Sequence, residues 1–332
     1  MGYLVFCIVV FAHSAVIYVD NNLSDGFWQN AHPTLKTAIS LAQPGDEIWV
    51  AKGVYTPGTS RNSSFLIPDG IKLYGGFYGG ETSLDDRDVH HNRSILSGDI
   101  GIPGNPSDNC HHIIRYSGKE KGESILDGFT VKNGYSDKGK GGGGLLVEIP
   151  ADLLIRNCHF LDNFSTTDGG AAKVKSGVTF ENCLFELNKA DNGGAVASMS
   201  DNEEHSEFSH CTFIKNTASS GSALNFRGEN EISVNNCVFW MNKDENNTIN
   251  SIYVPHNAML ASVKDCAFDD SPESLASAGG LIHYSSKDND GPFQNSTDYS
   301  VDEDHGIPGE WGWYTKSSSL VLNIRVFLEG AF

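Results

Sequence analysis

The sequence has few charged residues, and its cations are outnumbered by its anions. Charged residues make up 20% of the 332 positions, with 23 Lys and Arg against 42 Asp and Glu and a formal net charge of −19. A surface this acidic repels the phosphate backbone of nucleic acids and anionic lipid surfaces. We therefore expect no nucleic-acid partner.

Long hydrophobic runs are also missing, apart from one at the beginning. Residues 3–12 are uncharged and mostly apolar, and His13, Ser14 and Ala15 follow them. An apolar run of this length that ends in small residues is typical of a secretory signal peptide. We expect residues 1–15 to be removed and the mature chain, which has no transmembrane segment, to be a monomer that is secreted or held at the cell surface. The alternative is a buried first strand.

Glycine, in contrast, is abundant. The 36 glycines are about 11% of the chain, against roughly 7% in an average protein. Hydrophobic residues reach 39%, which is enough for a substantial core. Frequent turns together with a real core favour a β-rich fold and exclude a disordered chain or a coiled coil.

A repeat organises the middle of the chain. Its marker is Asn-Cys-x-Phe or a close variant, and five cysteines advance by 25, 28, 26 and 29 residues, at positions Cys158, Cys183, Cys211, Cys237 and Cys266. In the first four copies an Asn follows the Cys by five positions, and a pair of small residues comes after that Asn. Apolar residues alternate within the unit, which is the period of a strand. The repeat therefore predicts a β-solenoid.

Stacking of the repeats predicts where the cysteines lie in the fold. Successive coils of a parallel β-helix lie about 4.8 Å apart, so equivalent side chains form ladders. We expect the five repeat cysteines to be small apolar core residues in one ladder, beside a ladder of phenylalanines, with the Asn before each Cys at a tight corner. Disulfides between adjacent coils are the alternative, and the absence of a CxxC pair disfavours a metal site.

The repeat also resembles known families. Pairs such as Phe160-x-x-Asn163 alternate with segments such as Gly193-Gly194-Ala195-Val196. These resemble the FxxN and GGA(I/L/V) repeats of the polymorphic outer membrane proteins and, more broadly, the right-handed parallel β-helix repeats of the pectin-lyase-like superfamily. The resemblance covers roughly residues 125–270. It implies an all-β fold, a right-handed parallel β-helix.

The flanks of the repeat are interpreted as caps. Residues 16–57 resemble the first segment of secreted bacterial β-helix proteins and are expected to form an N-terminal cap and the first coil. Helical spacing of Leu35, Ala38, Ile39 and Ala42 predicts a short capping helix there. Residues 58–270 form the β-helix, and residues 271–332 form a C-terminal cap or tail. Within this tail, Glu310-Trp311-Gly312-Trp313-Tyr314 is expected to plug the solenoid, with a sugar-stacking platform as the alternative.

One strand face carries the candidate binding residues. On the strands that follow the small-residue pairs, alternation turns five polar side chains outward, namely Lys173, Lys175, Asn225, Arg227 and Tyr253. Lys175 and Arg227 are expected about 10 Å apart, two coils along the stack. Such cations pair well with the carboxylates or sulfates of an acidic glycan, and a tyrosine ring can stack on a sugar. The alternative is a solvated strand face that binds nothing.

The leading hypothesis is an exported binding module for acidic polysaccharide or a cell-surface glycan. The resemblance also allows a polysaccharide lyase or hydrolase acting on uronate glycans, since enzymes of the superfamily bind polysaccharide along the outside of one sheet. A lyase would use Lys173 or Lys175 as the base, with Ca²⁺, the only cofactor we expect, held by Asp162 or Asp191. A hydrolase could use the acidic run at residues 85–91, although no catalytic motif is recognised. A structural adhesin that binds no glycan is the third hypothesis.

Overall fold

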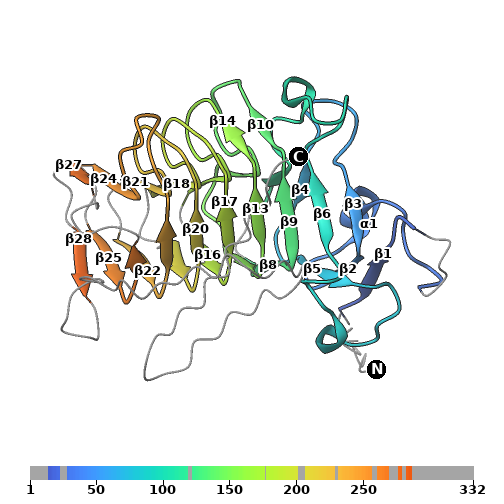
Figure 1. Ribbon diagram of the computed structural model, residues 1–332. Coiled ribbons are helices and arrows are strands. Elements are labelled where there is room, and N and C mark those ends of the chain that lie inside the picture. Colours follow the sequence, from blue (N-terminus) through green and yellow to red (C-terminus); the bar gives the residue numbers. More distant parts are fainter. Residues whose placement is uncertain are drawn as a thin grey trace, which may run out of the picture.

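The computed structural model describes residues 14–22, 28–118, 122–175, 177–200, 206–228, 231–255, 260–268, 276–278 and 282–285. These residues form a solenoid whose strands stack in three parallel sheets along one long axis (Figure 1). The expected all-β parallel β-helix is confirmed. Residues 1–13, which include Cys7 and most of the expected signal peptide, and the aromatic run at 310–314 lie outside the described residues.

The three sheets are named A, B and C. Sheet A has ten strands in the order β1 (Val16–Val19), β2 (Glu47–Ala51), β5 (Lys72–Phe77), β8 (Ser124–Asp127), β12 (Leu153–Arg156), β16 (Val178–Glu181), β19 (Ser206–Ser209), β22 (Glu231–Asn235), β25 (Leu260–Lys264) and β28 (Ile282–Ser285). Sheet B has eight strands, β3 (Gly53–Tyr55), β6 (Ser94–Ser97), β9 (Phe129–Lys132), β13 (His159–Leu161), β17 (Leu184–Glu186), β20 (Thr212–Ile214), β23 (Val238–Trp240) and β26 (Ala267–Phe268). Sheet C also has eight, β4 (Phe65–Ile67), β7 (Ile114–Tyr116), β11 (Leu145–Val147), β15 (Ala172–Val174), β18 (Val196–Ser200), β21 (Leu224–Gly228), β24 (Ile252–Pro255) and β27 (Ala276–Ala278).

Each regular coil runs from sheet C to sheet A to sheet B and then returns to sheet C by a longer loop. In two of these return loops the short strands β10 (Tyr135–Ser136) and β14 (Phe164–Ser165) pair with each other. The corner between sheets A and B is a single residue in the left-handed region, with φ between 50° and 54°, at Asn157, Asn182, His210, Asn236 and Asp265. The predicted tight corner before each repeat cysteine is thus confirmed.

The core is built from ladders of identical side chains. Rings of Phe185 and Phe213 stack with their centroids 4.8 Å apart, and the stack continues through Phe160, Phe239 and Phe268. All five repeat cysteines and Cys110 are buried, and none of these six forms a disulfide. The prediction of core thiols is therefore confirmed, and the disulfide alternative is wrong for these residues.

A second ladder consists of buried asparagines at the end of sheet B. The Oδ1 atom of Asn188 accepts hydrogen bonds from the main-chain N and the Nδ2 of Asn163, at 3.1 and 3.0 Å. Asn188 Nδ2 in turn donates to Phe160 O and to the Oδ1 of Asn216. The repeated Asn five positions after each Cys therefore joins successive coils through side-chain amides, which satisfy the buried main-chain groups there.

The N-terminal coil is covered by helix α1 (Leu35–Leu41). Thr34 Oγ1 accepts a hydrogen bond from Thr37 N at the start of this helix, and Leu35, Ala38 and Ile39 are its buried residues. The helix packs against β1, β2 and β4, which confirms the predicted capping helix. At the other end, β27 and β28 extend sheets C and A past residue 270, where the sequence pattern fades. No helix among the described residues is both long and apolar enough to cross a membrane.

Candidate functional site

The outer face of sheet C is formed as the sequence alternation predicts. Lys173 lies in register with Ala197, Ala197 with Asn225, and Asn225 with Tyr253. In the adjacent row Met199 is in register with Arg227. The side chains predicted to point inward on these strands, such as Val174, are buried. The register therefore brings the predicted residues onto one face of consecutive coils.

Exposure differs among these residues. Lys173, Lys175, Arg227 and Tyr253 are half-buried, so parts of their side chains reach solvent. Asn225 has no exposed surface, and its Nδ2 donates to Ser220 O at 3.1 Å. The expectation that Asn225 is a surface ligand is therefore wrong. The loop before β21 folds over this position, so the asparagine supports that loop.

Asp168 is a residue of this face that the sequence pattern did not reveal. Its Oδ2 lies 3.1 Å from Lys173 Nζ, and its Oδ1 lies 3.3 Å from Arg227 Nη1. Asn192 Nδ2 also donates to Oδ1. Because Asp168 is only 8% exposed, its carboxylate fixes the ammonium and the guanidinium in place. The predicted basic stripe is therefore partly neutralised and is a mixed-charge surface.

The same face continues toward the N-terminus with a second ion pair. Arg115 on β7 is in register with Leu146, which precedes Lys173 in the row. Arg115 Nη2 lies 3.0 Å from Glu148 Oε2, and both side chains are exposed. Cations on this face are thus paired with the acidic residues Glu148 and Asp168, which lie beside the strands of sheet C.

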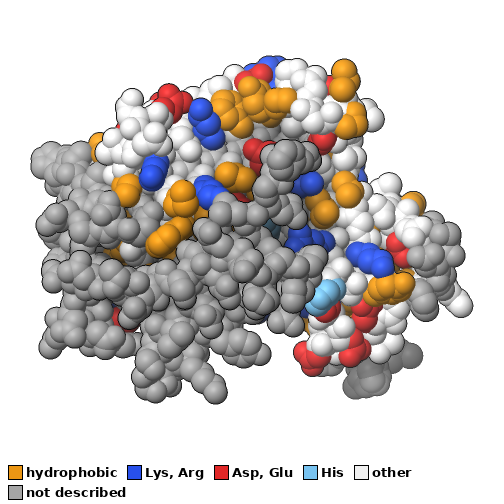
Figure 2. Space-filling view, viewed as in Figure 1, with side chains coloured by type: hydrophobic (Ala, Val, Ile, Leu, Met, Phe, Trp, Pro, Cys, Tyr) orange, Lys and Arg blue, Asp and Glu red, His pale blue; other side chains and the backbone are white. Residues whose placement is uncertain are grey.

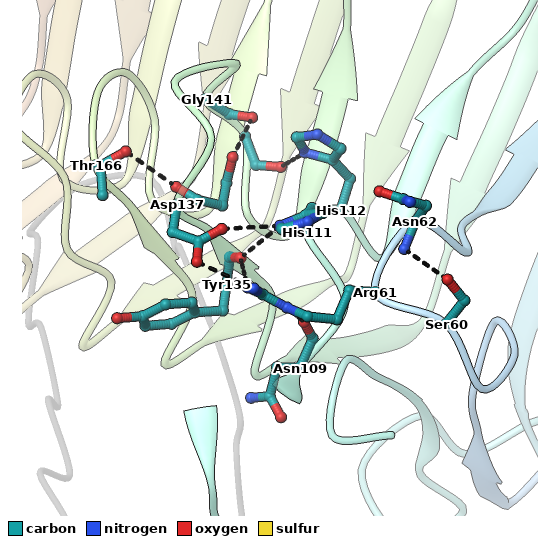
Figure 3. A network of polar contacts seen from close by, with 12 residues as sticks. Ser60, Arg61, Asn62, Asn109, His111, His112, Tyr135, Asp137, Gly141 and Thr166 are labelled. Carbon is teal, nitrogen blue, oxygen red and sulfur yellow. Dashed lines mark hydrogen bonds and ion pairs between the residues drawn. The ribbon is translucent and has the colours of Figure 1, made fainter. Parts of the chain in front are cut away.

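A third polar network lies where the chain enters β4 and β7 (Figure 3). Arg61 Nη1 is 3.0 Å from Asp137 Oδ2, and His111 Nδ1 is 3.1 Å from Asp137 Oδ1. Arg61 also donates to the carbonyl oxygens of Asn109 and Tyr135. Burial opposes ionisation of Asp137, but the hydrogen bond and charge of Arg61 hold the pKa of Asp137 below its usual value. The network is a partly exposed anchor with an ionised carboxylate at its centre.

The two histidines of this network are neutral. Burial, assisted by the charge of Arg61, lowers the pKa of His111. Burial also lowers the pKa of His112 to about 4. Since Nδ1 of His112 contacts Gly142 O at 2.9 Å, this nitrogen carries the proton and donates it. Neither histidine therefore contributes positive charge to sheet C at neutral pH.

Figure 2 shows how charge is distributed over one side of the molecule. Lys and Arg side chains are spread over the upper part of this face, where Figure 1 places β10, β14 and the neighbouring loops, among hydrophobic and acidic side chains. They form no continuous basic patch in this view, which agrees with the paired charges described above.

Other candidates from the sequence form no metal or catalytic site among the described residues. Asp162 and Asp191 are both exposed, and no three His, Cys, Asp or Glu residues gather as a metal site within the described ranges. In the 85–91 run, Asp88 accepts hydrogen bonds from the main-chain N of His90 and His91 and lies 2.7 Å from His91 Nδ1. Asp88 therefore caps its own turn. This run shows no pair of carboxylates facing a common cavity.

A pocket of about 90 Å³ lies on the outer side of sheet B. Its lining includes His90, Arg93 and His159. His159 Nε2 is 3.1 Å from Glu186 Oε2, and this interaction lowers the pKa of Glu186. The pocket is small and one of its polar groups is already paired, so sheet C is the better candidate for a long ligand.

No curated protein matches the sequence. Among solved structures, the chain is similar to the pectin methylesterase of Aspergillus niger, with 14% identity, a TM-score of 0.44 and coverage of 84% of this chain and 88% of that chain. It is also similar to YbhC of Escherichia coli, with 13% identity, a TM-score of 0.37 and coverage of 86% and 88%. The model of a family of proteins of unknown function, DUF1565, matches residues 19–290, and the chain therefore belongs to the DUF1565 family.

Proposed function

We propose that the protein is an exported extracellular or surface β-helix protein that binds an acidic polysaccharide along the outer face of sheet C. The observation that carries this proposal is the register of β15, β18, β21 and β24. It aligns Lys173 with Tyr253 in one row and Met199 with Arg227 in the next. Strands of neighbouring coils lie about 4.8 Å apart, a spacing comparable with one sugar unit of an extended chain.

The ion pairs leave donors for such a ligand. Arg227 has five N–H groups and a side chain that is 40% exposed, and its ion pair with Asp168 uses only the nitrogen Nη1. A glycan carboxylate can therefore bind the outer edge of the guanidinium while Asp168 holds the inner edge. The half-buried ring of Tyr253 offers an apolar surface for a sugar ring.

Lys173 is better suited to binding than to proton abstraction. Its Nζ already contacts Asp168 at 3.1 Å, so in this arrangement the amine is not turned toward a substrate. This geometry disfavours Lys173 as the base of a lyase and leaves Lys175 as the other candidate that the sequence offered. A glycan-free structural adhesin remains the second outcome to be tested.

The test compares an acidic polymer with its neutral counterpart. The purified full chain is passed over immobilised polygalacturonate and over the same polymer after reduction of its carboxyl groups, with and without Ca²⁺. The proposal predicts retention on the acidic polymer that weakens as salt is raised, because the contacts are charge-assisted. Equal retention on both polymers, or none on either, contradicts it. Ultraviolet absorbance of an unsaturated product in the eluate would identify a lyase instead.

A further inference from the structure

The loop between β6 and β7 closes on itself at its two ends. Cys110 N donates to Gly98 O at 2.9 Å. Asp99 and Asn109 therefore lie beside each other, one residue inside each end of the loop. The short helix η3 (Pro106–Asp108) brings Asp108 to the same place. Two carboxylates and one amide thus belong to the neck region of loop 98–110, which connects sheet B with sheet C.

Each carboxylate uses only one oxygen within the loop. Asp99 Oδ2 accepts from Gly104 N at 3.0 Å, and Asp108 Oδ2 accepts from Ile102 N at 2.9 Å and from Asn105 Nδ2 at 3.2 Å. The other oxygen of each, Asp99 Oδ1 and Asp108 Oδ1, is buried from solvent and has no hydrogen-bond partner. The loop is folded tightly here, since a Cβ on Gly101 would lie 2.5 Å from Asp108 Cγ.

Asn109 adds a third acceptor of the same kind. The residue is 5% exposed, and its Oδ1 is also buried and without a hydrogen-bond partner. Its main-chain oxygen accepts from Arg61 Nε at 2.9 Å, while Figure 3 shows its side-chain amide pointing away from Arg61. The amide therefore belongs to the loop neck and not to the Arg61 network.

Three buried acceptor oxygens need a partner, which is either a hydrogen-bond donor or a cation. An unpaired buried acceptor costs about 1–3 kcal/mol, and a charged one costs more. Residues 98–110 contain no Lys or Arg, and the nearby Arg61 is held by Asp137. A bound cation would satisfy all three oxygens at once and remove the repulsion between the two carboxylates.

We propose that loop 98–110 binds a Ca²⁺ ion through Asp99 Oδ1, Asp108 Oδ1 and Asn109 Oδ1, with main-chain carbonyls and water completing the shell. Oxygen ligands alone select a hard cation, whereas zinc prefers Cys and His. An irregular loop with two glycines and two prolines between Gly98 and Cys110 suits the adaptable coordination of Ca²⁺ better than the strict octahedron of Mg²⁺. This site is separate from Asp162 and Asp191.

The site would order one edge of sheet C. The main chain of Asn109 holds Arg61, and Arg61 holds Asp137 and stacks near the ring of Tyr135. His111, two residues after Asn109, completes the same network. Calcium at the loop neck would therefore stabilise the polar anchor from which β4 and β7 begin.

The experiment measures Ca²⁺ binding to the chelator-treated full chain by isothermal titration calorimetry, with Mg²⁺ in a parallel titration. The proposal predicts one saturable Ca²⁺ site and a rise in the melting temperature on Ca²⁺ addition. The variant with Asp99→Asn and Asp108→Asn should bind at least about tenfold more weakly. The control with Asp85→Asn and Asp86→Asn, which removes the same charge from an exposed turn, should bind as the wild type does.

The single variant Asn109→Ala separates loss of Ca²⁺ binding from loss of folding, since it keeps both carboxylates. It should weaken Ca²⁺ binding while far-ultraviolet circular dichroism still reports the wild-type β-sheet signal. Absence of a saturable Ca²⁺ site in the wild type, wild-type affinity in the Asp99 and Asp108 variant, or Mg²⁺ binding as tight as Ca²⁺ binding would each overturn the proposal.

Discussion

In the middle coils, from β11 to β26, the same contacts recur from one coil to the next. In the N-terminal coils, from β1 to β8, polar networks occur once each. The middle coils stack phenylalanines and asparagines in ladders, as at Phe185 and Asn188. The N-terminal coils instead carry larger loops that hold Arg61, Arg87 and the neck of loop 98–110. The repeated contacts of the middle coils stabilise the core, whereas the irregular loops of the N-terminal coils hold the polar networks.

The buried carboxylate of Asp127 illustrates the second kind of contact. It has no exposed surface and accepts hydrogen bonds from Arg87 Nη2 at 2.6 Å, Arg156 Nε at 2.7 Å and Asn157 Nδ2 at 2.8 Å. Arg87 comes from a loop of an earlier coil, and Arg156 and Asn157 come from the end of β12 and the corner that follows it. The network therefore ties the irregular region to the first regular coil.

The largest loss of stability is expected in the ladder of stacked phenylalanines. Phe185→Ala removes a ring that is stacked between Phe160 and Phe213 with no exposed surface. Loss of its burial and the cavity left behind should lower the free energy of unfolding by about 3–5 kcal/mol. Denaturant unfolding measures this change. The control Thr179→Ala, on the outer side of β16, should change stability little, and a similar loss in both variants would contradict the ladder account.

The stability of the N-terminal coils should depend on pH through His112. The folded pKa of His112 is lowered from 6.5 to about 4, so between these values the unfolded chain binds a proton that the folded chain does not. Stability should therefore fall as the pH falls through this window, by up to about 3 kcal/mol for this one group. His112→Asn keeps a donor for Gly142 O and should flatten the dependence. His210→Asn, at an exposed corner, is the control, and an unchanged slope in the His112 variant would contradict the assignment.

A smaller effect is expected when the charge of Asp127 is removed. Asp127→Asn keeps the shape of the side chain but weakens its hydrogen bonds to Arg87 and Arg156. A charge-assisted hydrogen bond contributes about 1.5–3 kcal/mol, and both arginines retain access to water, so we expect a loss of about 2 kcal/mol. Thermal unfolding of this variant beside Asp162→Asn, an exposed corner residue, measures the difference. Equal stability of the two variants would show that the network does not join the regions.

The smallest effect is expected in the thiol ladder. Cys211→Ala removes one buried sulfur and should cost about 1 kcal/mol, since only a small apolar group is lost. Burial also raises the pKa of Cys183 and Cys237, which suppresses their thiolates. The five repeat cysteines should therefore react with a thiol reagent only after unfolding. Rapid labelling of these cysteines in the folded state would contradict their place in the core.

The regular part of the fold could be predicted because its signals repeat. Alternation identifies the strands, and the spacing of Cys158, Cys183 and their equivalents fixes the coil length. Three of the five left-handed corners follow from the Asn before Cys158, Cys183 and Cys237, and His210 and Asp265 take the same conformation before the other two repeat cysteines. The closer resemblance to polymorphic outer membrane proteins stays a prediction, as do the signal peptide and the monomeric state.

The charged contacts could not be predicted in the same way. Arg61 and Asp137 are 76 positions apart, in loops without periodicity. Asp168 lies just before a small-residue pair and outside the strand that alternation assigns, so its contacts with Lys173 and Arg227 were missed. Asn225 was placed on the correct side of β21, but alternation does not reveal a loop that covers this side.

The account rests on sheet C as the binding surface, and one comparison tests this most directly. Affinity electrophoresis through polygalacturonate compares the wild type with a variant carrying Lys175→Ala and Arg227→Ala, and with a control carrying Lys36→Ala and Lys264→Ala, two exposed residues away from sheet C. Both variants lose two positive charges. The account predicts at least about tenfold weaker binding for the sheet C variant alone, since each lost charge-assisted contact contributes about 1.5–3 kcal/mol. Equal migration of the two variants would contradict it.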